Sequence, residues 1–143
     1  MTIFSRLLPL MAVVGCASST VIELSPTELL RVSCSSMDGG KTCFGYGELY
    51  ADGRSDACGR VPNGPEFALQ MTYEISGNTL CETVVKTSHS AVMPIGQKLC
   101  GIYTERRDNA LVYRFTDDPT DKVRISYDAV RSDKWCQHLI DAL

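Results

Sequence analysis

The sequence lacks the short motifs that mark common catalytic and metal sites. No two cysteines are separated by two residues, which argues against a zinc ribbon or a thioredoxin-like redox pair. There is no G-x-S-x-G nucleophile elbow, no H-E-x-x-H zinc motif and no Asn-x-Ser/Thr glycosylation sequon. We therefore predict no metal site and no cofactor, and we expect a protein that is not an enzyme.

The chain also has no excess of positive charge and only two histidines. Its formal net charge is −3, which argues against binding to nucleic acid and against electrostatic docking on anionic lipid. The two histidines are His89, after an expected strand, and His138, near the C-terminus. Two converging histidines could carry out acid–base chemistry on a phosphodiester, so a small secreted hydrolase such as a ribonuclease is one alternative. Nothing in the sequence brings the two side chains together.

No hydrophobic run approaches the roughly 20 residues that a transmembrane helix needs, so we expect no transmembrane segment. The longest run, residues 7–14, follows the single basic residue Arg6 and precedes a series of small residues. This is the order of a cleavable secretory signal. We therefore expect residues 1–17 to be a signal peptide, cut either before Cys16 or after Ala17.

The cleavage region carries a second pattern. Val13-Val14-Gly15-Cys16 resembles the lipobox of bacterial lipoproteins, in which two small or aliphatic residues and a glycine precede the cysteine that is acylated. The resemblance implies a lipid anchor on Cys16, and Ala17 after it implies retention in the outer membrane. A signal peptidase cut after Ala17 would instead remove Cys16 and release the protein. We take free secretion as the leading hypothesis and a membrane-anchored lipoprotein as the alternative.

Either route leaves a single disulfide-rich globular domain over residues 18–143. It holds an even number of cysteines: Cys34, Cys43, Cys58, Cys81, Cys100 and Cys136. In an exported chain this predicts three disulfides, and fifteen connectivities are open. Each bridge typically adds about 2–4 kcal/mol to the free energy of unfolding.

Hydrophobic alternation predicts antiparallel strands over much of the domain. Residues 67–75 alternate with period two, and Gly77-Asn78 is a hairpin turn signal. Further strands are expected over residues 80–87, 99–106, 111–115 and 123–127. The glycine-rich segment 43–65 predicts one short strand at 47–51, followed by a loop that contains Cys58.

Two helices are expected at the ends of the domain. Ser25-Pro26-Thr27-Glu28 has the capping-box form and predicts a short helix that runs toward Cys34. A C-terminal helix is expected over residues 132–143, with Trp135 and Leu139 on one apolar side. The fold class is therefore α+β and mostly β: an antiparallel meander sheet or small open barrel with a short N-terminal helix and a C-terminal helix.

Tyrosine and arginine are the residue types most expected at a binding surface, because both are enriched in binding hot spots. Four of them lie in or beside glycine-rich or turn segments and form the candidate binding patch: Tyr46, Tyr50, Arg106 and Arg107. The sequence favours a small exported non-catalytic binding protein, a secreted effector or inhibitor acting on a protein or another extracellular macromolecule. The alternatives are an envelope lipoprotein with a structural role, tethered through Cys16, and the secreted hydrolase.

Overall fold

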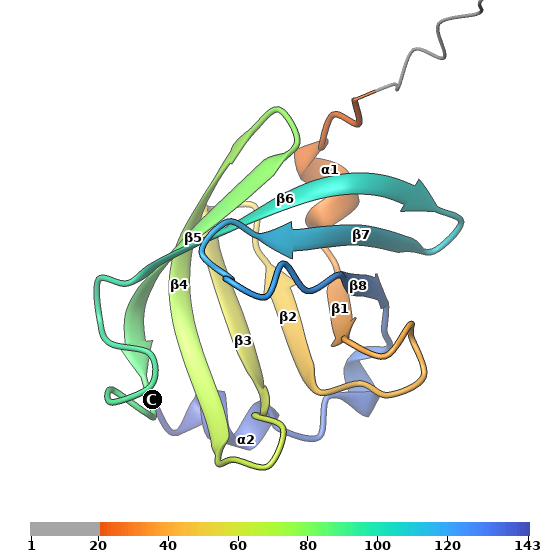
Figure 1. Ribbon diagram of the computed structural model, residues 1–143. Helices are drawn as coiled ribbons and strands as arrows, with labels where there is room; N and C mark the ends of the chain where they lie inside the picture. The colour runs from red at the N-terminus through yellow and green to blue at the C-terminus, as the bar shows by residue number, and fades with distance from the viewer. Residues whose placement is uncertain (1–20) are drawn as a thin grey trace, which may run out of the picture.

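The computed structural model describes residues 21–143, and its dominant feature is a closed antiparallel barrel of eight strands (Figure 1). The strands are β1 (Val32–Ser36), β2 (Gly45–Leu49), β3 (Arg54–Arg60), β4 (Glu66–Ser76), β5 (Thr79–Thr87), β6 (Lys98–Arg107), β7 (Ala110–Phe115) and β8 (Arg124–Asp128). Each strand pairs with the next, and β8 pairs back onto β1. The expected signal peptide and Cys16 lie outside the described residues.

The fold prediction is confirmed in part: the sheet forms a small antiparallel barrel, but the barrel is closed where a meander sheet or an open barrel was expected. Strand β1 pairs on one side with β2 and on the other with β8, where Cys34 lies opposite Tyr127. A closed barrel leaves no strand edge unpaired, and eight strands are enough to close around a narrow interior. Five strands and one further short strand were expected, and six strands are too few for such a barrel.

The two strands that the sequence did not predict, β1 and β3, lie in segments without a strand pattern. The helix expected to run toward Cys34 ends early: α1 covers only Pro26–Leu29, and β1 follows it. Its capping box is confirmed, since the Ser25 backbone N–H donates to Glu28 Oε1 at 2.8 Å. The loop expected around Cys58 is strand β3, which pairs with both β2 and β4.

The C-terminal helix is shorter than expected. A 3₁₀ turn, η1 (Arg131–Asp133), precedes α2 (Gln137–Asp141), and α2 lies on the outer face of β3 and β4. Cys136 and Ile140 are buried there. Trp135 is not on the buried side: it is 46% exposed, and the Arg60 guanidinium lies 5.9 Å from its ring centroid. No helix in residues 21–143 is long and apolar enough to cross a membrane.

The N-terminal segment closes one end of the barrel. Leu24 and Leu29 are buried against inward-facing side chains of the strands, namely Leu80, Tyr103, Leu111 and Tyr113. The segment is also held by polar contacts, because the Leu24 N–H donates to the carbonyl of Gly77 at 2.9 Å. Figure 1 shows α1 at the opposite end from the loops that join β1 to β2 and β3 to β4.

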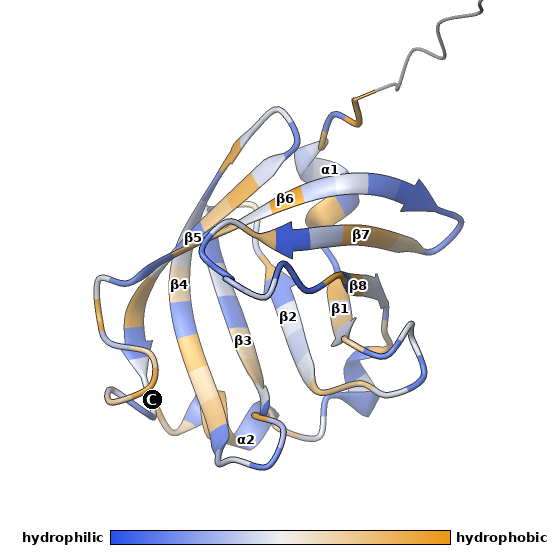
Figure 2. Cartoon of the chain, in the orientation of Figure 1, coloured by the Kyte–Doolittle hydropathy of each residue, from blue (hydrophilic) through white to orange (hydrophobic). Residues whose placement is uncertain are grey.

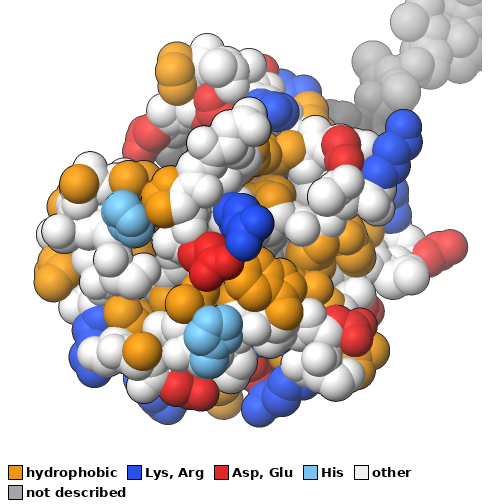
Figure 3. All heavy atoms as spheres, turned by 90° about the horizontal axis from the view of Figure 1, so that it is seen from below, with side chains coloured by type: hydrophobic (Ala, Val, Ile, Leu, Met, Phe, Trp, Pro, Cys, Tyr) orange, Lys and Arg blue, Asp and Glu red, His pale blue; other side chains and the backbone are white. Residues whose placement is uncertain are grey.

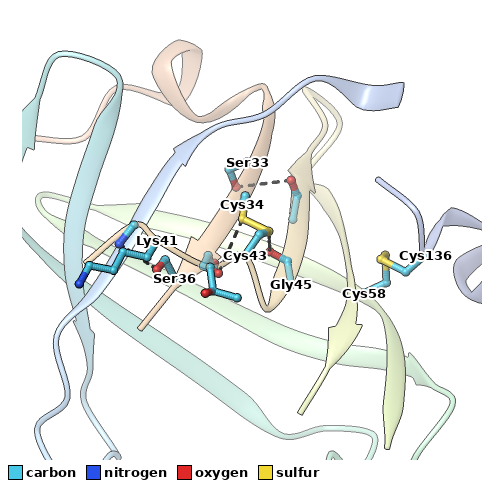
Figure 4. Close-up of a disulfide and its surroundings, with 12 residues drawn as sticks. Ser33, Cys34, Ser36, Lys41, Cys43, Gly45, Cys58 and Cys136 are labelled. Carbon is cyan, nitrogen blue, oxygen red and sulfur yellow. Dashed lines mark hydrogen bonds between the residues drawn. A yellow bond between two sulfur atoms is a disulfide. The ribbon is translucent and has the colours of Figure 1, made fainter. Parts of the chain in front are cut away.

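Three disulfides join the six predicted cysteines: Cys34–Cys43, Cys58–Cys136 and Cys81–Cys100. The first closes the loop between β1 and β2, the second holds the α2 segment on β3, and the third links directly opposed positions of β5 and β6. Figure 4 shows the first bridge beside the start of β2, with the second on the neighbouring strand. Three disulfides are consistent with an extracytoplasmic location.

Candidate functional site

The barrel encloses a cavity of about 160 Å³. Its two walls differ in side-chain size. The wall made by β8, β1, β2 and β3 carries mostly small residues, namely Ser126, Ser33, Ser35, Gly45, Gly47 and Ala57, beside the larger Tyr46, Leu49 and Asp56. The wall made by β4 to β7 carries large ones, namely Phe67, Leu69, Met71, Leu80, Tyr103, Tyr113 and Phe115. The cavity exists because the large side chains of one wall meet no matching volume on the other.

Gly47 shows how open the small-residue wall is. A Cβ atom added at Gly47 would come no closer than 3.6 Å to any neighbour, which is ordinary van der Waals contact. Gly59 has the opposite setting: a Cβ there would lie 2.4 Å from the carbonyl oxygen of Phe44, so only glycine fits. Glycine at 59 therefore serves close strand packing, whereas glycine at 47 leaves space.

A second, apolar cavity of about 260 Å³ lies at the end opposite α1. It is lined by the loops after β1, β3 and β5, with residues such as Met37, Val61, Pro62 and Val92. The two cavities adjoin, because four large side chains line both of them: Phe44, Phe67, Met93 and Phe115. Figure 3 views the molecule from this end and shows hydrophobic side chains gathered around the middle of the face. We call this second cavity the mouth.

The mouth contains one strongly charged group, and that group is already paired. Arg124 donates from Nη1 to Asp118 Oδ2 at 2.9 Å, and its guanidinium lies 4.6 Å from the centroid of the Phe115 ring. Hydrogen bonds from Thr120, and then from Arg124, lower the pKa of Asp118 to about 2. The pair is mostly shielded from solvent, with both side chains about 15% exposed. The positive charge of Arg124 is thus neutralised beside the mouth.

The inner cavity also contains an acidic group. Glu82 of β5 lines it, and the Ser55 hydroxyl donates to Glu82 Oε1 at 2.7 Å. Burial raises the pKa of Glu82, and the Ser55 hydrogen bond partly opposes this effect. Nearby, the rings of Tyr103 and Tyr113 stack with centroids 5.1 Å apart, and burial raises the pKa of both phenols. The cavity is therefore mostly apolar, with polar groups at Glu82 and at the serines of the small-residue wall.

The structure does not bring the four residues of the predicted binding patch together. Tyr46 packs on the outer face of the barrel with the α2 cluster. The other three side chains each bond to a local acidic residue: Tyr50 to Asp56, Arg106 to Glu28, and Arg107 to Glu105. These contacts are separate, and each stabilises its own part of the barrel surface.

The two histidines also occupy different settings. His89 lines the mouth, whereas His138 is exposed on α2 and lines neither cavity. The Nδ1 atom of His138 lies 3.2 Å from the carbonyl oxygen of Trp135. The hydrolase alternative, which needs both rings at one substrate, gains no support from this placement.

Sequence reasoning missed the cavity residues. A signal for them exists in the alternate spacing of small residues in Ser33-x-Ser35 and Gly45-x-Gly47, which places them on one face of each strand. Glu82 carries a second signal, because it shares strand parity with the buried residues Leu80 and Val84.

Comparison with known proteins supports the fold. No protein-family model matches the chain, and no curated protein matches it. A crystal structure of a lipocalin-like protein from Bacteroides uniformis ATCC 8492 aligns with a TM-score of 0.50 at 13% identity, over 71% of this chain and 99% of that one. An uncharacterized protein from Bacteroides eggerthii DSM 20697 gives a TM-score of 0.46 at 9% identity, with the same coverage. The first similarity shows that the chain has a lipocalin-like barrel fold.

Proposed function

We propose that this protein binds a small apolar molecule inside its barrel. The observation that carries the proposal is the cavity between the small-residue and large-residue walls, closed at one end by α1 and adjoining an apolar mouth at the other. Small eight-stranded barrels either fill their interior with side chains or hold one small ligand. A concave, mostly apolar site with a few polar groups is the usual form of a small-molecule site.

The dimensions limit the ligand to a small molecule. An apolar protein cavity of about 150 Å³ accommodates benzene, so the inner cavity of about 160 Å³ has room for one ring or a short chain. The mouth adds about 260 Å³ for the rest of the molecule. The macromolecular partner expected from the sequence cannot enter this site, and binding of such a partner by the outer surface stays a separate prediction.

A dye titration tests the proposal. N-phenyl-1-naphthylamine is uncharged and becomes fluorescent in apolar surroundings, and we expect it to bind with saturation at one dye per protein. Gly47→Leu places a side chain in the inner cavity and should abolish binding. Thr72→Leu adds the same side chain at an exposed position of β4 and should leave binding unchanged.

The two variants make the test specific. Equal loss of binding in both would indicate a general effect of added hydrophobicity. Equal retention in both would place the dye outside the cavity. Either result would contradict the proposal.

We also propose export through the N-terminal segment, with free secretion as the leading route and lipidation of Cys16 as the alternative. The even number of cysteines in three disulfides supports an oxidising compartment. Mass spectrometry of the mature N-terminus separates the routes, because an acylated Cys16 indicates a lipoprotein and an N-terminus at Ser18 indicates secretion. A mature chain that still begins at Met1 would refute export.

A further inference from the structure

Glu82 is directed into the barrel by its position on β5. Its neighbour Cys81 forms a disulfide with the directly opposite Cys100, on the outer side of the two strands. Successive side chains of a strand point to opposite faces, so Glu82 points inward with Leu80 and Val84. An acidic residue is uncommon at such a position, because burying a carboxylate without a partner is unfavourable.

The carboxyl group of Glu82 is only partly satisfied by the protein. Its Oε1 atom accepts the Ser55 hydrogen bond, but Oε2 accepts none from residues 21–143. No ion pair in that part of the chain involves Glu82. The phenols of Tyr103 and Tyr113 line the same cavity and are neutral hydrogen-bonding groups, and Asp56, which also lines it, already accepts a hydrogen bond from Tyr50. One carboxyl oxygen is therefore available to a molecule that occupies the cavity.

We propose that the ligand carries a cationic amine that binds the Glu82 carboxylate, with its apolar body extending toward the mouth. This inference rests on the proposed function and specifies the ligand class for the same cavity. An ammonium supplies both the opposite charge and the hydrogen-bond donors that the carboxyl lacks, and its approach favours the ionised form.

The other charges of the site exclude an anionic ligand. A carboxylate or phosphate head group in the inner cavity would lie beside Glu82 and be repelled by it. The two basic residues whose charges act on the cavity phenols are already paired, Arg124 with Asp118 and Arg31 with Asp128. The charge arrangement therefore selects a positive group inside and an uncharged body outside.

The test compares three probes with one apolar tail: octylamine, 1-octanol and octanoate. Each is titrated into the wild-type protein by calorimetry and, in parallel, used to displace N-phenyl-1-naphthylamine. Because the tail is shared, differences in affinity report the head group. We expect octylamine to bind about tenfold or more tightly than 1-octanol, and octanoate to bind most weakly.

Glu82→Gln keeps the size of the side chain and its contact with Ser55 but removes the charge. In this variant we expect the preference for octylamine over 1-octanol to disappear while 1-octanol binds as before. The wild-type ranking of the three probes needs no variant, so the inference stays testable if Glu82→Gln does not fold.

The outcomes separate this inference from the proposed function. Equal affinity for all three probes, a preference for octanoate, or an unchanged amine preference in Glu82→Gln would overturn the amine assignment and leave the binding function standing. Absence of binding by the dye and by all three probes would overturn both.

Discussion

Gly47→Leu distinguishes an empty barrel interior from a packed one by the sign of its effect on stability. In a cavity the leucine side chain becomes buried, which contributes about 1.5–3 kcal/mol. Replacing a glycine whose backbone conformation suits other residues adds about 0.4–1 kcal/mol by restricting the unfolded chain. We therefore expect the free energy of unfolding to rise by about 2–4 kcal/mol. In a fully packed core the same side chain would instead cost about 1–3 kcal/mol through overpacking.

The assay is urea unfolding followed by circular dichroism. The dependence of the unfolding free energy on urea should be similar in wild type and variant, and the midpoint of Gly47→Leu should move to higher urea. Thr72→Leu is the matched control, and its free energy should stay within about 0.5 kcal/mol of wild type, as is usual for surface substitutions. A Gly47→Leu variant less stable than wild type by 1 kcal/mol or more would refute the cavity.

Two further predictions concern stability. Replacing both Cys58 and Cys136 by alanine opens a bridge between positions 78 residues apart, so chain entropy predicts a loss of about 4.5 kcal/mol in urea unfolding, and a loss below about 1 kcal/mol would contradict it. Burial raises the pKa of Glu82, so its contribution to stability is fully present below the ordinary glutamate pKa and is lost as pH rises through the raised pKa. The stability of Glu82→Gln relative to wild type should therefore increase from pH 4 to pH 8, and a constant difference would be the contrary result.

Four of the six strands expected from the sequence, β4 to β7, have large side chains on the inner face. Residues of β4 alternate because Leu69 and Met71 face the interior and Gln70 and Thr72 face outward. Strands β1 and β3 place small residues inside, so hydrophobic alternation was absent there. The small inward-facing residues of these strands also leave the cavity open. The absence of large inward-facing side chains therefore concealed the strands in the sequence and defines the site.

The face assignment of β8 also needs correction. The alternation of residues 123, 125 and 127 predicts that they share the buried side, but Arg124 and Ser126 line the cavities. Ile125 lies on the opposite, outer face and is nevertheless buried. Both faces of β8 are thus partly covered, and side-chain type alone could not show which one faced the interior.

The site and the disulfide pairing depend on contacts between distant parts of the chain. The inner cavity requires β1 to pair with β8, which joins residues about 90 positions apart, and no local pattern encodes that register. Parity within β5 could have placed Glu82 inside, but only closure of the barrel shows that its carboxyl meets a cavity. Fifteen connectivities were open for the cysteines, and the observed one follows from strand neighbours and the docking of α2.

The most direct test of ligand binding inside the barrel is NMR of protein labelled with ¹³C at the methionine methyl groups. Residues 21–143 contain three methionines: Met71 and Met93 line the inner cavity, and Met37 lines the mouth. On titration with N-phenyl-1-naphthylamine, the methyl signals of Met71 and Met93 should shift with the same saturation as the dye fluorescence. Dye fluorescence that saturates while both signals stay in place would contradict binding in the cavity.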